Sequence, residues 1–177
     1  MKKSLILLLT TFTFSCCNKD DNPTPANPIS QLPPATQTGA NTFGCLLDGQ
    51  VFIPGGGTNP LDCVYQFVNG GYYFALQGNK RDSDNNLLRI SIGTINLQIA
   101  QNNIYQLKEQ QDGNSVGRFS VNGLPSYTSS NYTGELKITK LDTQNQIVSG
   151  TFWFDVKDQN NVIHQIRDGR FDMQYTQ

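Results

Sequence analysis

The sequence predicts an all-β fold, on three observations. After residue 41, turns rich in Gly, Asn and Asp recur at short spacing, beginning at positions such as Asp48, Asn69, Asp112 and Asp168. These residue types tolerate the positive φ angles that tight reversals need. Between the turns, apolar and polar residues alternate with period two, which is typical of half-buried strands. No series of long helical stripes separates the strands, so a parallel, doubly wound fold is disfavoured.

Taken in chain order, the alternation defines a set of strands that each have one apolar face, and we expect these faces to form the core. They are Cys63, Tyr65 and Phe67; Tyr72, Phe74 and Leu76; Leu88, Ile90 and Ile92; Phe119 and Val121; Leu136 and Ile138; Phe152, Phe154 and Val156; and Phe171, Met173 and Tyr175. Residues 97–111 are ambiguous, because Leu97, Ala100, Ile104 and Leu107 also fit one helical stripe. A short helix or irregular turn followed by a strand is predicted there. The whole pattern fits an antiparallel β-sandwich or a calycin-like barrel of about eight to ten short strands.

The start of the chain has the pattern of an export signal with a lipid attachment site. Lys2 and Lys3 precede a short apolar run at 5–14, and Cys16 and Cys17 follow it closely. The run is too short for a transmembrane helix, which needs about 20 residues. We therefore predict a cleaved signal peptide at residues 1–16 and acylation of Cys17, with Cys16 as the alternative.

The composition changes between the signal and the strands. Five of the eight prolines lie in residues 17–41, and this stretch has no aromatic residue. Such a segment cannot form a core, so residues 17–41 are predicted to be a disordered, Pro-rich tether and residues 42–177 the all-β domain. Acyl chains, at about 0.8 kcal/mol per buried CH₂, would make the membrane a partner without a transmembrane helix.

Two cysteines, Cys45 and Cys63, remain in the predicted domain. In an oxidising compartment a disulfide between them is the simplest expectation. The alternative, a metal-binding or redox pair, lacks companions, because the chain has one histidine, His164, and no Cys-x-x-Cys motif. We expect no metal and no cofactor.

The charge balance indicates which classes of partner the protein can bind. The formal net charge is -1, only 15% of the residues are charged, and no basic stripe is visible. Nucleic acid is therefore not an expected partner. Asn and Gln outnumber the charged residues, 34 against 27, which indicates a neutral, hydrogen-bonding surface.

Catalytic motifs are weak, and we do not expect an enzyme. Residues 113–117 match G-x-S-x-G, and Asp155 and His164 follow in hydrolase order, but an alternating strand rather than a helix follows Ser115. Residues 82–86 open like a calcium loop, yet Leu87 replaces the glycine needed at the sixth position. These motifs are better explained as turns and strands.

The only tryptophan is the most informative aromatic residue. If Phe152 and Phe154 point inward, Trp153 lies on the polar face of the same strand. Aromatic rings on polar faces stack against sugar rings, so Trp153 together with Tyr73 is a hypothetical glycan-binding face. The alternative is that a neighbouring strand covers Trp153.

Motifs along the chain resemble a known group. Asn18, Lys19, Asp20 and Asp21 follow the lipidated cysteine, and the segments 43–54, 149–154 and 168–172 carry strand-and-turn patterns. Together they resemble a family of uncharacterised Bacteroidetes-type outer-membrane lipoproteins. This resemblance implies an extracytoplasmic all-β domain that is lipid-anchored in the outer membrane and exposed at the cell surface, with the periplasmic face as the alternative; it carries over no catalytic residue.

Two functions follow from these observations. The first is a surface-displayed binding or scaffold module that contacts a glycan or an envelope protein. The alternative is a lipocalin-like carrier of a small apolar ligand, which would need a barrel with an empty interior. A filled core with an exposed aromatic face would favour the binding module.

Overall fold

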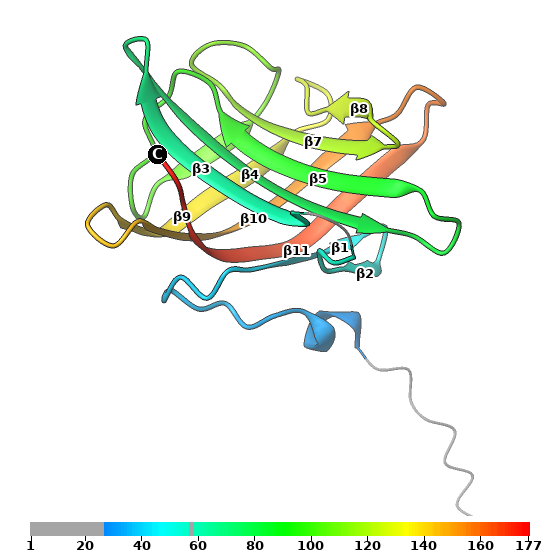
Figure 1. The fold of residues 1–177 in the computed structure, drawn as a ribbon. Helices are drawn as coiled ribbons and strands as arrows, with labels where there is room; N and C mark the ends of the chain where they lie inside the picture. Colours follow the sequence, from blue (N-terminus) through cyan, green and yellow to red (C-terminus); the bar gives the residue numbers. More distant parts are fainter. Residues whose placement is uncertain (1–26, 57–58) are drawn as a thin grey trace, which may run out of the picture.

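The computed structural model describes residues 27–56 and 59–177 (Figure 1). The predicted signal peptide and the lipidation site at Cys17 or Cys16 lie outside the described residues. In the described part, one 3₁₀-helix precedes eleven strands, and no α-helix is present. The elements are η1 (Pro28–Gln31), β1 (Thr42–Leu47), β2 (Gln50–Phe52), β3 (Leu61–Val68), β4 (Gly71–Arg81), β5 (Leu87–Thr94), β6 (Ile104–Leu107), β7 (Ser115–Val121), β8 (Leu124–Tyr127), β9 (Gly134–Asp142), β10 (Ile147–Lys157) and β11 (Ile163–Gln174). The all-β prediction is confirmed, with one strand more than the upper end of the predicted range.

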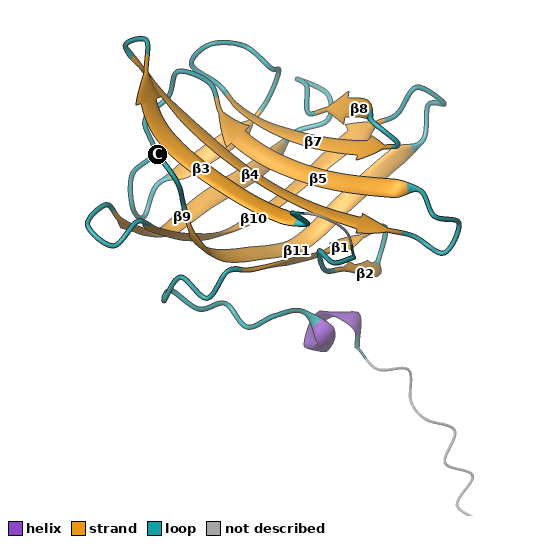
Figure 2. Cartoon of the chain, viewed as in Figure 1, coloured by secondary structure: helices purple, strands orange, loops and turns teal. Residues whose placement is uncertain are grey.

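All strands belong to one sheet in the order β2-β1-β11-β10-β9-β6-β7-β5-β4-β3, with β8 paired to β7. Every pairing is antiparallel except the short contact between β6 and β7, which is parallel, so the sheet is mixed rather than purely antiparallel. The sheet folds over into two layers, with β3, β4, β5 and β7 in one and β9, β10, β11 and β1 in the other (Figures 1 and 2). The result is a sandwich-like fold around one core.

The chain after β11 links the two layers at one edge of the sheet. Tyr65 N of β3 donates to Thr176 O at 2.9 Å, and Thr176 N donates to Cys63 O at 3.0 Å. These bonds form a parallel bridge between Val64 and Thr176. Part of the free edge of β3 is thereby paired, which protects backbone groups that would otherwise be exposed.

The predicted apolar faces form the core with few exceptions. Phe43, Phe52, Phe74 and Phe154 are among its largest fully buried side chains. Phe67 is the clear error, because its side chain is 62% exposed near the β3–β4 turn, beyond the part of β3 that Thr176 covers. The alternation placed Phe67 on the correct face but could not show that the opposite layer ends before it.

Residues 95–103 form an irregular loop that leads into β6, which confirms the predicted irregular turn followed by a strand and not its alternative, a short helix. Ile104, part of the proposed helical stripe, is 54% exposed, whereas Ile99 is buried. The hydroxyl of Tyr105 stabilises the loop, because it accepts a hydrogen bond from Ala100 N at 2.7 Å and donates to Gln98 O at 3.3 Å. Contacts to a tyrosine on the following strand therefore determine the loop conformation.

The predicted disulfide is absent: Cys45 and Cys63 are free thiols, and both are buried in the core. Cys45 on β1 faces Phe52 across its strand pair, whereas the free edge of β3 beside Cys63 is paired with Thr176. The two cysteines thus share the interior without being cross-strand neighbours. Burial raises the pKa of both thiols well above the usual range, since a thiolate would lose its hydration there.

The predicted tether is ordered over its described part, and we call residues 27–41 the strap. The strap lies beside β1 and β11 in Figure 1, and its Leu32 side chain is only 7% exposed. Pro33 packs so closely on Gly44 that a Cβ at Gly44 would lie 2.6 Å from the proline Cδ. The prediction of disorder for residues 17–41 is therefore wrong from residue 27 onward, because a segment too polar for its own core can still pack on an existing sheet.

Candidate functional site

Two hollows on the outer surface of the sheet combine aromatic and polar side chains. The Trp153 pocket is lined by Ala35, Glu135, Thr151, Phe152, Trp153, Asp168, Gly169 and Arg170, and has a volume of about 410 Å³. The Arg118 trough crosses the other layer and has a volume of about 320 Å³.

The Trp153 pocket is built around a β-bulge. Phe152 pairs with Gly169, but Phe154 pairs with Ile166, so β11 has two residues opposite the single residue Trp153. Those two residues are Arg167 and Asp168, and Asp168 adopts a φ of 52°. A bulge of this kind bends the strand and redirects its side chains. Here it lets side chains of two consecutive β11 residues contribute to the surroundings of the tryptophan.

Arg167 holds the indole in place. Its guanidinium carbon lies 5.4 Å from the centre of the Trp153 ring, which is cation–π geometry. The same guanidinium pairs with Asp155 at 2.6 Å and donates to Phe154 O at 3.1 Å. Trp153 remains 40% exposed, on the face opposite its buried neighbours. The tryptophan is therefore an exposed ring with a restrained orientation, next to the carboxylate of Glu135, its cross-strand partner on β9.

The strap contributes Ala35 to the wall of this pocket, and Asp172 anchors the strap. The Asp172 carboxylate accepts hydrogen bonds from Thr36 Oγ1 at 2.6 Å, Thr38 N at 2.9 Å, Gly39 N at 2.8 Å and Ser149 Oγ at 2.8 Å. The side chain is completely buried. Burial raises the pKa of Asp172, but these hydrogen bonds outweigh it and hold the pKa well below its usual range. Asp172 is therefore ionised when the strap is bound.

Tyr73, the second residue of the predicted glycan-binding face, lies elsewhere. It is on β4, opposite Gln66 of β3, in the other layer of the fold (Figure 1). Four strands, β9, β6, β7 and β5, separate β4 from β10 along the sheet. The structure therefore does not bring Tyr73 and Trp153 together. Alternation within a strand shows which residues share a face, but not which strands become neighbours or how the sheet folds over.

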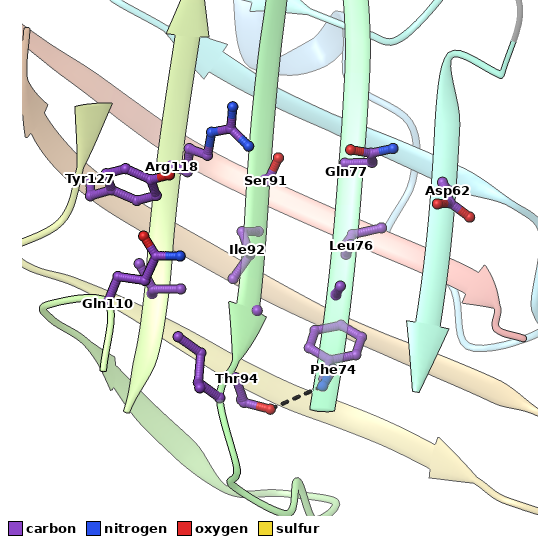
Figure 3. A pocket seen from close by; sticks show the side chains of 14 residues that line it. Asp62, Phe74, Leu76, Gln77, Ser91, Ile92, Thr94, Gln110, Arg118 and Tyr127 are labelled. Atoms are coloured by element: carbon purple, nitrogen blue, oxygen red, sulfur yellow. Dashed lines mark hydrogen bonds between the residues drawn. The ribbon is translucent and has the colours of Figure 1, made fainter. Parts of the chain in front are cut away.

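The Arg118 trough follows one row of side chains across five strands. The strand registers pair Asp62 with Gln77, Gln77 with Ser91, Ser91 with Arg118, and Arg118 with Tyr127. We call these five residues the polar row, and Figure 3 shows them side by side on β3, β4, β5, β7 and β8. The Arg118 guanidinium lies 5.9 Å from the centre of the Tyr127 ring.

Small side chains form the floor beside the polar row. The next register positions pair Ala75 with Gly93 and Gly93 with Val116, so a shallow channel runs across the strands. Gln110, from the loop after β6, faces the channel from the other side (Figure 3). Gly93 is required here, since a Cβ would lie 2.6 Å from the carbonyl oxygen of Phe74. The trough therefore has a flat floor and a polar wall.

Two polar atoms of the trough have no partner. Ser91 Oγ and Arg118 Nε are buried atoms without a hydrogen bond to any described residue. Buried polar atoms are nearly always paired in folded proteins, so such atoms at the wall of a hollow call for an explanation. Arg118 also has no carboxylate partner within the described residues, unlike Arg167.

The residues of the hydrolase-like motif are not assembled into a catalytic site. Ser115 is buried at the start of β7 and Asp155 pairs with Arg167. The His164 ring contacts Asp48 Oδ2 at 2.8 Å, and its other nitrogen lies 3.7 Å from Asp158 Oδ2. These contacts join the β1–β2 and β10–β11 turns. Within the described residues, no group of three or more His, Cys, Asp or Glu side chains is placed to hold a metal ion.

The calcium-like segment is a turn. Asp82 Oδ1 accepts hydrogen bonds from Asp84 N at 2.9 Å and Asn86 N at 2.8 Å, and Asp82 Oδ2 accepts one from the Asn86 side chain at 3.0 Å. These bonds, those from Asn86 first, lower the pKa of Asp82. The carboxylate is thus occupied in stabilising the β4–β5 turn.

Sequence reasoning missed Arg118 and Asp172. Both alternate with buried residues and so were correctly expected on an outer face, but nothing local distinguishes them from other surface charges. Among the residues of the two hollows, only Trp153 could be singled out from the sequence, because a tryptophan is unusual on the polar face of a strand.

These features define an all-β domain in which a single folded-over sheet carries two polar hollows on its outer surface. Residues 83–173, just over half of the chain, match the family described as a domain of unknown function, DUF6252, and the chain belongs to this family. No curated protein and no solved structure matches the chain. In the described ranges, no helix has the length and apolarity to cross a membrane.

Proposed function

We propose that this protein is a lipid-anchored, extracytoplasmic binding module that holds a glycan against Trp153. The main support for this proposal is the environment of Trp153. The side chain is 40% exposed, its ring centre lies 5.4 Å from the guanidinium carbon of Arg167, and it lines a pocket of about 410 Å³. A restrained aromatic ring binds at a low cost in conformational entropy. Sugar rings present an apolar face that stacks on such a ring, while their hydroxyls bond to polar neighbours.

The polar neighbours suit hydroxyl groups. Glu135 and Asp168 offer carboxylate oxygens as acceptors, Arg170 offers donors, and Thr151 offers both. Binding sites typically combine an apolar contact surface with a few such groups that fix orientation. A neutral oligosaccharide would therefore find both kinds of contact in one pocket.

The apolar-carrier alternative is less well supported, because aromatic side chains fill the interior. Phe152 lies 5.3 Å from Phe43, 6.3 Å from Phe154 and 6.4 Å from Phe171, measured between ring centres. Rings at these separations are in contact with one another. A carrier needs open space where these rings lie.

The scaffold alternative has one observation in its favour. Phe67 and Val68, at the end of edge strand β3, are 62% and 41% exposed. An exposed apolar strand end is a surface on which an envelope protein could bind. The patch is small, so glycan binding remains the first proposal.

The location is part of the proposal and comes from the N-terminal sequence. Lys2, Lys3, the apolar run and Cys17, with Cys16 as the alternative, support lipidation, and the acidic residues after Cys17 support display on the outer membrane. If the strap stays bound, nine residues connect Cys17 to residue 27, and the distance between these two residues is at most about 35 Å. Metabolic labelling with palmitate, compared between Cys17→Ala and Cys16→Ala, and protease treatment of intact cells test these points.

Tryptophan fluorescence tests glycan binding directly, because Trp153 is the only tryptophan. The full-length chain is titrated with a panel of neutral oligosaccharides. We expect a saturable fluorescence change with at least one member, and loss of calorimetric binding in Trp153→Ala. Tyr73→Ala is the matched control, since it removes an exposed-face aromatic from the other layer and should bind normally. Equal binding by Trp153→Ala, or no response to the whole panel, would overturn the proposal.

A further inference from the structure

We propose that the Arg118 trough is a second, independent binding site, which takes a small ligand carrying one carboxylate. It lies on β3, β4, β5, β7 and β8, away from the Trp153 pocket on β9, β10 and β11, and does not rest on the proposed glycan site. Its volume, about 320 Å³, is at the lower end of the range for small-molecule sites.

The cation of this site is free to bind an anion. Arg118 Nε is buried and has no hydrogen-bond partner among the described residues. Its guanidinium contacts Tyr127 at 5.9 Å, but a ring face does not accept the directed N–H bonds that a guanidinium makes to oxygen. Arg167, by comparison, is paired with Asp155. Arg118 is therefore a positioned cation whose Nε–H has no acceptor in the described protein.

The neighbouring groups favour a carboxylate over a more highly charged anion. A guanidinium presents paired N–H groups that match the two oxygens of a carboxylate. Among the described residues, Arg118 is the only cationic one that lines the trough, and Asp62 lines its other end. A phosphate dianion would lack a second positive charge among the described residues of the trough.

Ser91 extends the site beyond the anion. It is the cross-strand neighbour of Arg118, and its hydroxyl oxygen is also buried without a partner in the described protein. Figure 3 shows Arg118 leaning over β5 toward Ser91, with Gln77 on the next strand. A ligand bound through its carboxylate to Arg118 would place its next polar groups beside Ser91 and Gln77.

The length of the polar row limits the size of the ligand. Asp62 and Arg118 are three strands apart, which corresponds to about 14 Å at the usual strand spacing. The floor of Ala75 and Gly93 has almost no side-chain height, so a flat ring or an extended backbone can lie on it. Sugar acids and the carboxyl ends of short peptides both have this shape and charge.

Calorimetry with the full-length chain tests the site with four probes: D-glucuronate and N-acetyl-alanine as carboxylates, and D-glucose and N-acetyl-alaninamide as their neutral counterparts. We expect at least one carboxylate to bind about tenfold or more tightly than its neutral counterpart, because the charged hydrogen bonds to Arg118 are lost in the latter. Whichever carboxylate binds better identifies the source of the ligand as a sugar or a peptide.

Two variants of the trough and one control variant locate the binding. Arg118→Gln should weaken carboxylate binding by about tenfold or more. Arg81→Gln removes an exposed arginine at the far end of β4 and is the charge-matched control, which should bind normally. Ser91→Ala should also weaken binding while leaving the charge unchanged, which separates loss of the site from a general change of net charge.

Three results would overturn the inference. One is the absence of carboxylate binding by the folded wild-type chain. Another is equal binding by Arg118→Gln, with its fold confirmed by circular dichroism. A third is tighter binding of inorganic phosphate than of either carboxylate, which would contradict the charge argument. Loss of glycan binding in Trp153→Ala leaves this test unaffected, because the trough is on the other layer.

Discussion

Replacing Asp172 by Asn should strongly destabilise the protein, because this buried carboxylate joins the strap to the sheet. It accepts hydrogen bonds from three backbone amides, Thr38 N at 2.9 Å, Gly39 N at 2.8 Å and Ala40 N at 3.2 Å. Thr36 and Ser149 donate their hydroxyls to the same group. An asparagine keeps one acceptor oxygen and turns an NH₂ group toward some of these donors.

The magnitude follows from the number of bonds. Hydrogen bonds to a charged group contribute about 1.5–3 kcal/mol each, and they are not additive when they share one acceptor. Because some bonds survive in Asn, we expect a loss of about 3–5 kcal/mol in the free energy of unfolding. This is a large part of the roughly 5–15 kcal/mol available to a domain.

Urea unfolding of the full-length chain, followed by far-ultraviolet circular dichroism, measures this loss. Asp168→Asn is the control, because it makes the same change in charge on the same strand at an exposed position. Hydrogen exchange should show faster exchange of the Thr38, Gly39 and Ala40 amides in Asp172→Asn only. A loss within about 0.5 kcal/mol of the control, the usual range for surface substitutions, together with unchanged exchange would refute the anchoring role.

The same group has a defined pH dependence. The folded-state pKa of Asp172 is depressed, so its contribution to stability is present above the unfolded value of about 3.9 and is lost as the pH falls below it. The Asn variant has no such titration. The difference in unfolding free energy between wild type and Asp172→Asn should therefore be constant from about pH 7 to pH 5 and shrink as the solution is acidified from about pH 4. A difference that grows on acidification would contradict this assignment.

Three further predictions concern packing and thiol chemistry. Gly44→Ala should lower the free energy of unfolding by about 1–3 kcal/mol and loosen the strap, since the new Cβ would lie 2.6 Å from a proline carbon of the strap. Urea unfolding measures this loss, and a variant as stable as the wild type would contradict the prediction. Gly134→Ala should lower the free energy of unfolding by more, about 3 kcal/mol or above, because its Cβ would meet the backbone carbonyl oxygen of Trp153, which cannot rotate away. A soluble variant with wild-type stability would argue against this contact. Burial raises the pKa of both core thiols, so iodoacetamide at about pH 8 should leave Cys45 and Cys63 unlabelled in the folded chain and label both after unfolding without reductant. Peptide mass spectrometry reads this out, and two peptides that stay unlabelled until a reductant is added would establish the disulfide instead.

Periodicity in the sequence was enough to determine the class of fold and most of the core. Whether a side chain in a strand points inward depends on its own position and on the residues beside it, so Phe152 and Phe154 could be assigned to the core and Trp153 to the surface without any knowledge of neighbouring strands. The same local rule failed for Phe67. This residue alternates in phase with the buried residues of its strand, but it lies where the opposite layer ends.

The candidate sites, in contrast, depend on which strands become neighbours. Ser91 and Arg118 are far apart in the chain and become partners only through the register of β5 and β7. Asp172 lies on the outer face of its strand, where alternation predicts exposure. It is nevertheless buried, because the strap, more than 130 positions earlier in the chain, lies over it. Tyr73 and Trp153 looked equivalent in sequence, and the folding of the sheet put them on opposite layers.

Local sequence patterns therefore define the strands, the face that each strand buries and the unusual exposure of Trp153. The order of the strands, the docking of the strap on Asp172 and the polar row arise from pairing between distant segments. Alternation reflects burial within one strand, whereas register, strap and trough depend on contacts between segments whose pairing no local pattern encodes.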